Sequence, residues 1–83
     1  MRLILYSKPG CHLCEGLQEK LEQVQKVAFE LEVRDITTND TWWQAYEYEI
    51  PVLVVDSTPP QRLPRLSPRG TVAQLEKMLA KYS

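Results

Sequence analysis

A short, wholly apolar run near the N-terminus, Leu3–Tyr6, limits this chain to few architectures. Such a run fits a strand that is covered on both faces of a sheet. After a proline-glycine break, apolar residues recur at spacings of three and four from Cys11 to Val27, with polar residues between them, which predicts an amphipathic helix. Phe29–Arg34 then alternates apolar and charged residues, as a strand near a sheet edge does. The order is therefore β-α-β, with the two strands parallel.

The rest of the chain predicts a short helix, two strands and a last helix. In order, these are a helix over Thr41–Glu47 capped by Asn39 or Asp40, an apolar strand Val52–Val55, a weak strand Gln61–Leu66, and a helix that Thr71 caps, with Val72, Leu75, Leu79 and Tyr82 on its apolar stripe. The weak strand contains proline, which cannot donate to a ladder, so it belongs at a sheet edge. Residues 1–83 thus form one α/β domain, β-α-β-α-β-β-α, with helices flanking a mixed four-stranded sheet.

Composition and charge argue against two classes of binding partner, nucleic acids and membranes. Ten bases against eleven acids give a formal net charge of -1, whereas a nucleic-acid-binding domain normally carries a basic surplus. No segment approaches the roughly 18 apolar residues of a membrane span, and the first residues are too few and too mixed for a secretory signal. We therefore expect a cytoplasmic monomer that binds neither nucleic acid nor membrane. Five bases and one acid lie between Gln61 and Ser83, and we interpret them as solvated surface charge.

The two cysteines of the chain, Cys11 and Cys14, stand at the junction of the buried strand and the first helix. A pair at this spacing beside a βαβ pattern predicts redox chemistry. The first turn of a helix holds unpaired amides and a partial positive charge, so a thiolate there is stabilised and its pKa falls below the free value of about 8.5. We predict that Cys11 is the exposed nucleophile and that Cys14, one turn deeper, resolves the mixed disulfide.

Other roles for the pair compete with redox chemistry. Zinc needs four ligands and only Cys11, Cys14 and His12 are soft donors, so we expect no metal. Haem attachment needs a histidine directly after the second cysteine, where Glu15 stands. An inert pair in a non-catalytic relative stays open. The role of His12 is open as well: a protonated imidazole would lower the thiolate pKa of Cys11 and make the disulfide more oxidising, and a neutral solvent-facing ring would do little.

A second signal is Ile50-Pro51, which opens the later apolar strand. A proline at this place either ends the preceding helix as a trans residue or forms a cis bond in a tight turn. Aromatic residues gather just before it, and we interpret them as core packing, with a partner-binding surface as the alternative. These residues are Trp42, Trp43, Tyr46 and Tyr48.

Together these motifs resemble the glutaredoxin-like branch of the thioredoxin superfamily. The matching segments, in order and spacing, are Leu5–Cys14, Asp35-Ile36 and Ile50–Leu53. The resemblance implies a thioredoxin fold, a cis proline at Pro51 that faces the cysteines, and a backbone at Ile50 that pairs with a bound peptide or glutathione. It also implies that Lys8 lowers the thiol pKa and meets a carboxylate of glutathione.

The chain departs from the family pattern at three places. His12-Leu13 replaces Pro-Tyr between the cysteines, Glu49-Ile50 replaces Thr-Val before the proline, and Ser67–Thr71 replaces a Gly-Gly turn. These changes weaken the expected glutathione contacts, and the carboxylate of Glu49 would repel an anion if it pointed inward. The remaining candidate contacts for glutathione or another carboxylate, at a helix start, are Arg69 and the amides of Thr71 and Val72.

The resemblance predicts a thiol–disulfide oxidoreductase that reduces glutathione mixed disulfides or protein disulfides through Cys11 and Cys14. Lys8, Ile50 and Pro51 would position the substrate. No bound cofactor is expected, and glutathione is the candidate co-substrate. Two alternatives are a thioredoxin-fold adaptor without turnover, and an iron–sulfur carrier in which two Cys11 thiolates and two glutathiones hold a cluster between subunits.

Overall fold

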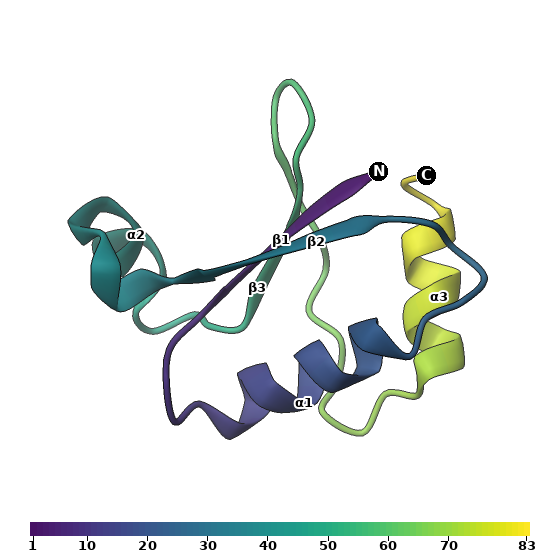
Figure 1. Cartoon of the computed structure of the whole chain (residues 1–83), viewed down its shortest axis with the longest axis horizontal. Helices are drawn as coiled ribbons and strands as arrows, with labels where there is room; N and C mark the ends of the chain where they lie inside the picture. The colour runs from purple at the N-terminus through teal and green to yellow at the C-terminus, as the bar shows by residue number, and fades with distance from the viewer.

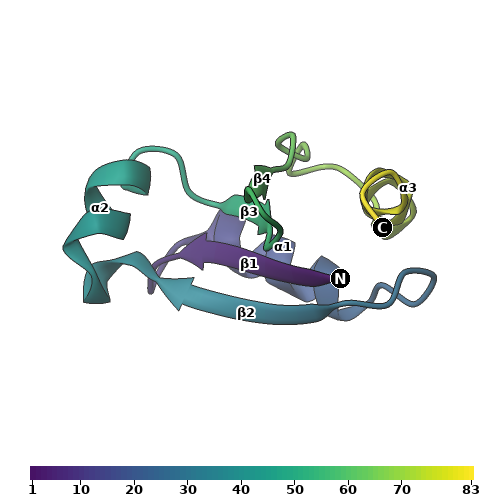
Figure 2. The same ribbon diagram turned by 90° about the horizontal axis from the view of Figure 1, so that it is seen from above.

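Four strands form a single sheet in the computed structural model, which describes all of residues 1–83. They are β1 (Arg2–Ser7), β2 (Glu30–Asp35), β3 (Val52–Val55) and β4 (Gln61–Arg62). Their order in space is β2-β1-β3-β4; β2 runs parallel to β1, whereas β3 is antiparallel to β1 and β4 is antiparallel to β3. The two wholly apolar strands thus lie in the centre and the alternating strand lies at an edge, as predicted (Figure 2). β2 lies one residue later than predicted.

Helices pack against both faces of this sheet, and Figure 1 shows them around its strands. They are α1 (His12–Glu22), a single 3-10 turn η1 (Ile36–Thr38), α2 (Asp40–Tyr46) and α3 (Val72–Ala80). Residues of α1 and α3 share one core cluster with the sheet, and residues of η1 and α2 pack in a second cluster on its other face. The predicted mixed four-stranded α/β architecture is confirmed. None of these helices has the length and apolar character needed to cross a membrane.

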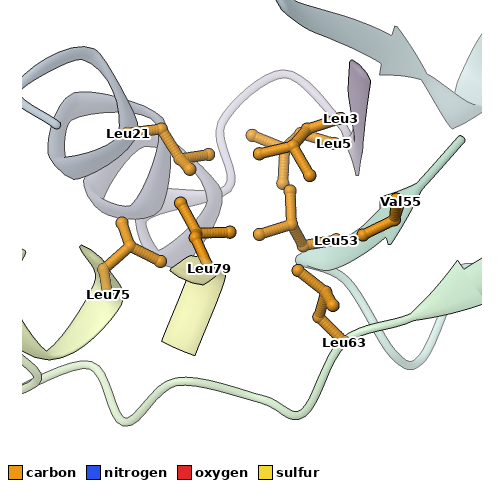
Figure 3. Packing of buried hydrophobic residues seen from close by; sticks show 8 residues of the cluster. All are labelled: Leu3, Leu5, Leu21, Leu53, Val55, Leu63, Leu75 and Leu79. Carbon is orange, nitrogen blue, oxygen red and sulfur yellow. The ribbon is translucent and has the colours of Figure 1, made fainter. Parts of the chain in front are cut away.

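The alternation of side chains along the central strands divides the core into two layers, because successive residues of a strand point to opposite faces. On one face, Leu3 and Leu5 of β1 pack with Leu21 of α1 and with Leu75 and Leu79 of α3, all at most 1% exposed (Figure 3). The cluster on the opposite face consists of Ile4, Tyr6, Ile36, Val52 and Val54. Both faces of β1 are covered, which explains why the strand is apolar throughout.

The predicted aromatic cluster is divided by the fold. Trp42 and Tyr46 pack on the second core cluster, and their ring centroids lie 5.9 Å and 4.4 Å from that of Tyr6. Trp43 and Tyr48 are exposed instead, Tyr48 to 91%. The core interpretation is therefore right for the first two residues and wrong for the other two. A helix that rests on a sheet buries only one stripe, which leaves Trp43 outside the core, and Tyr48 lies in the turn after α2.

The first helix is shorter than predicted, since it ends at Glu22 rather than Val27. The amides of Gln25 and Lys26 donate instead to the carboxylate of Glu76 on α3, at 2.9 Å and 3.1 Å. These two hydrogen bonds hold the pKa of Glu76 below its usual value. The chain can leave the helix here because another element satisfies the backbone amides. Val27 still packs against the core, which is why the apolar pattern continues past the helix end.

The last strand is also shorter than predicted, because β4 spans Gln61–Arg62 instead of Gln61–Leu66. Pro64 has no amide to donate, so the ladder cannot continue through it. Leu63 is buried nonetheless, and its amide donates to the carbonyl of Leu53 at 2.9 Å. The segment that follows leaves the sheet and forms one wall of the cleft described below.

Two predicted helix caps are confirmed. The Oδ1 atom of Asn39 accepts a hydrogen bond from the amide of Trp42 at 3.1 Å, and α2 begins directly after Asn39, at Asp40. The Oγ1 atom of Thr71 accepts from the amide of Gln74, whose side chain accepts in turn from the amide of Thr71. This capping box satisfies amides at the start of α3 that have no partner within the helix.

Candidate active site

The pair Cys11 and Cys14 lies where β1 has ended and α1 begins. Cys11 is the N-cap residue of α1, and Cys14 lies in its first turn. The two are joined as a disulfide, with their Cα atoms 5.3 Å apart. Cys14 is buried at 2% exposure, whereas Cys11 is half-buried. The more accessible cysteine is thus the one predicted to attack.

The turn before Cys11 delivers it to the helix start. Gly10 has a φ of +80°, in the left-handed region that a residue with a side chain rarely adopts. The amide of Cys11 donates to the carbonyl of Lys8 at 3.3 Å, which closes the turn. Pro9 and Gly10 therefore do more than end β1, because together they set the direction from which the chain enters α1.

A backbone donor of α1 points at the sulfur of Cys11. The amide nitrogen of Cys14 lies 3.3 Å from the Cys11 Sγ atom and donates to it. This amide belongs to the first turn, whose donors have no partner within the helix. Such donors and the helix dipole carry partial positive charge, so they favour the anionic form of a sulfur at this position once the disulfide is reduced.

Two charged side chains beside the cysteines differ in their surroundings. The side chain of His12 is 95% exposed, and its Nδ1 atom lies 3.6 Å from the carboxylate of Glu15 on the next turn. The Nζ atom of Lys8 lies 5.8 Å from the ring centroid of Trp43, a cation–π distance. The exposed Trp43 therefore has a contact that the sequence did not predict, since it lies far from Lys8 along the chain.

The peptide bond between Ile50 and Pro51 is cis, as the resemblance implied. The amide of Ile50 donates to the carbonyl of Tyr46 at 3.2 Å. Its carbonyl oxygen lies 3.5 Å from Nη2 of Arg65, which donates to it. Both main-chain groups that were predicted to pair with a substrate are thus engaged within the protein itself. Sequence reasoning did not identify Arg65.

A mostly apolar cleft of about 580 Å³ begins at the cysteine motif. His12 and Leu13 of the motif line it together with Pro51, and its other apolar lining residues include Leu17, Leu53, Leu63, Leu66 and Met78. Leu13 is one of the apolar residues that recur along the predicted helix, but it is 48% exposed and lines this cleft. Along the apolar stripe of α1, Leu21 near the C-terminal end therefore packs in the core, whereas Leu13 near the N-terminal end lines the cleft.

Three bases line the cleft and no acid does: Lys20, Arg62 and Arg65. The carboxylate of Glu49 lies 3.1 Å from the guanidinium of Arg62, so its negative charge is compensated. Arg62 and Arg65 are exposed, in agreement with the interpretation of the bases between Gln61 and Ser83 as solvated surface charge, and they also line the cleft.

The predicted anion contacts Arg69, Thr71 and Val72 do not line this cleft. The amide of Thr71 donates to Oε1 of Gln74 at 2.9 Å within the capping box. A carboxylate could reach that amide only if the box opened. The role of these three residues as glutathione contacts stays a prediction.

A parallel-antiparallel sheet of this order, with a two-cysteine motif at a helix start and a cis proline before β3, defines a thioredoxin-fold protein. The chain belongs to the Glutaredoxin-like domain (DUF836) family, whose model matches residues 2–80. The expected fold and the stated resemblance are thereby confirmed.

Solved structures agree with the fold. The chain is 26% identical to the Northeast Structural Genomics target protein XcR50 from X. campestris, over 95% of this chain and 96% of that one, with a TM-score of 0.68. Thioredoxin 1 from the thermophilic eubacterium Thermosipho africanus TCF52B shares the fold at 15% identity, with a TM-score of 0.66 over 99% of this chain and 93% of that one. No curated protein matches the chain.

Proposed function

We propose that this protein is a thiol–disulfide oxidoreductase that reduces protein disulfides or glutathione mixed disulfides with the dithiol of Cys11 and Cys14. The observation that carries the proposal is the hydrogen bond of 3.3 Å from the Cys14 amide to the Cys11 sulfur at the start of α1. After reduction, a thiolate at this position has a stabilising donor in place, and the cysteine to which it is bonded in the disulfide is buried.

The proposed reaction has two steps. The thiolate of Cys11 attacks one sulfur of the substrate disulfide, forms a mixed disulfide and expels the other substrate sulfur as a thiolate. The thiolate of Cys14 then attacks the Cys11 sulfur, which releases the second substrate thiolate and leaves the disulfide between Cys11 and Cys14. Two electrons pass from the dithiol to the substrate, and an external thiol such as glutathione returns them.

The remaining assignments belong to the same proposal. Lys8 adds positive charge to the turn that precedes Cys11, and Ile50 and Pro51 position the substrate backbone beside the motif. In this proposal the protein is a cytoplasmic monomer without a bound cofactor. The thiol systems of the cytoplasm keep such a dithiol reduced. Its partners are disulfide-bearing proteins or glutathione mixed disulfides.

Equilibration in glutathione buffers of graded ratio tests this function. We expect both thiols, Cys11 and Cys14, to be lost together, at a reduction potential within the range of about -270 to -120 mV of working oxidoreductases. Free thiols are counted at each ratio, and mass spectrometry identifies any glutathionylated species. A potential far outside this range, together with no turnover of a glutathionylated peptide, would indicate an adaptor without redox activity.

A further inference from the structure

The charge around the cleft is one-sided. The chain carries eleven acids and ten bases, yet the residues that line the cleft include three bases and no acid. Arg62 is paired with Glu49 at 3.1 Å. Lys20 and Arg65 take part in none of the ion pairs of the structure, and the Nζ atom of Lys20 donates to the carbonyl of Pro68. Two positive charges therefore border the cleft without a carboxylate partner.

Arg65 reaches from the segment after β4 to the two residues before Pro51. Its Nη1 atom lies 3.3 Å from the carbonyl oxygen of Glu49, and its Nη2 atom lies 3.5 Å from that of Ile50. Both distances exceed the usual range of about 2.7–3.2 Å for such hydrogen bonds. The planar guanidinium fork matches one carboxylate better than it matches two separate carbonyl groups. An incoming carboxylate that takes over Arg65 would also free the Ile50 carbonyl to accept from a substrate backbone.

The apolar part of the cleft favours a ligand that carries an apolar side chain. Leu17, Leu66 and Met78 line the cleft together with the motif residues His12 and Leu13, and they offer apolar surface that an apolar ligand side chain would cover favourably. Glutathione has no such side chain, because it consists of γ-glutamate, cysteine and glycine. A protein segment with a leucine-sized residue next to its cysteine does.

We propose, on the basis of the oxidoreductase function proposed above, that the preferred substrate is a protein disulfide whose cysteine is flanked by an apolar residue and a carboxylate side chain. Arg65 is the specificity-determining residue that binds this carboxylate. The apolar residue fills the cleft, the carboxylate draws Arg65 away from the carbonyls of Glu49 and Ile50, and the freed Ile50 carbonyl accepts a backbone N–H of the bound segment.

Single-turnover kinetics of the reduced protein test this preference. The substrates are short peptides with one cysteine and a leucine on one side of it. On the other side, each peptide has a glutamate at one of three positions, and its counterpart has a glutamine at the same position. Each cysteine carries 2-mercaptoethanol in a disulfide. One turnover converts the protein dithiol to the disulfide of Cys11 and Cys14 and releases the peptide thiol and 2-mercaptoethanol, so no other reductant is needed. We expect the best glutamate peptide to react about fivefold faster than its glutamine counterpart at low salt, with the ratio falling as salt is added.

Substitutions locate the preference on Arg65. Arg65→Gln should bring the ratio of the two rates close to one, whereas Arg65→Lys, which keeps the charge without the planar fork, should keep part of it. Lys77→Gln is the matched control, because it removes an exposed cation of α3 that does not line the cleft, and it should leave the ratio unchanged. The ratio in the wild-type protein requires no variant, so it tests the preference even if Arg65→Gln does not fold.

The outcomes separate this inference from the function on which it rests. If neither glutamate nor glutamine peptides react faster with the protein than with dithiothreitol, the oxidoreductase function and the preference both fail. If both react rapidly and at equal rates, or if Arg65→Gln keeps the ratio, only the preference is overturned. If oxidised glutathione reacts faster than every glutamate peptide and is slowed as strongly by Arg65→Gln, the cleft is a glutathione site and the peptide preference is overturned.

Discussion

Cys11→Ser is expected to reduce disulfide turnover to the level of the uncatalysed reaction. A serine hydroxyl has nearly the same size as the thiol, but it stays protonated at neutral pH and cannot form a mixed disulfide. The hydrogen bond from the Cys14 amide would remain available to the new oxygen, so the fold should persist. Turnover of a glutathionylated peptide and of a disulfide-bonded protein, with glutathione as the reductant, measures the loss.

Cys14→Ser is the matched control, because it keeps the attacking thiol and removes the resolving one. Without added glutathione, we expect one equivalent of substrate thiol to be released, and mass spectrometry should find the other half of the substrate attached to Cys11. The reverse pattern, in which Cys11→Ser is trapped on the substrate and Cys14→Ser is inert, would mean that the two roles are exchanged.

Leu75→Ala is expected to lower the free energy of unfolding by about 2–5 kcal/mol. Leu75 is fully buried, and it lies in the cluster that joins α3 to α1 and the sheet (Figure 3). At roughly 0.05–0.15 kcal/mol per residue, a chain of 83 residues has about 4–12 kcal/mol in total, so one truncation removes a large share. Denaturant-induced unfolding, followed by far-UV circular dichroism, measures the change.

Leu13→Ala makes the same chemical change on α1 at a residue that is 48% exposed. It should alter the free energy of unfolding by no more than about 0.5 kcal/mol, as substitutions at the surface usually do. If both substitutions cost the same free energy, α3 does not pack on the sheet as described.

The central and edge positions of the strands could be predicted because the burial of a strand determines which of its residues are apolar. Leu3–Tyr6 and Val52–Val55 are apolar at every position, and both strands are covered on two faces. The alternation over Phe29–Arg34 marks the edge strand β2 for the same reason. Caps were predictable as well, since Asn39 and Thr71 act on amides only a few residues away.

Features that depend on distant partners could not be predicted. The early end of α1 at Glu22 accompanies the hydrogen bonds that Glu76 accepts from the loop after the helix. No periodicity along α1 contains this information, because the partner lies on another element. A second cis bond, Thr58–Pro59, follows β3 and has no local signal that separates it from an ordinary turn.

In the candidate site, too, features set by neighbouring residues could be predicted and features that depend on distant residues could not. Cys11 and Cys14 were predictable because their spacing and their place after a buried strand carry the chemistry within a few residues. The cationic border of the cleft was not predictable, because Lys20 of α1 and Arg65 of the segment after β4 line the same cleft only in the folded chain. The signal that could have indicated it is the stretch Ser57–Leu75, which contains three arginines and no acid.

All of these proposals depend on whether the start of α1 holds the Cys11 sulfur as an anion in the reduced protein. The rate of its alkylation by iodoacetamide, followed by mass spectrometry as a function of pH, measures the thiolate population. We predict that Cys11 reacts at close to its full rate between about pH 6 and 7, where a free thiol with a pKa of about 8.5 is almost entirely protonated, and that buried Cys14 is spared. A rate that rises only around pH 8.5, as for a free thiol, would contradict the account.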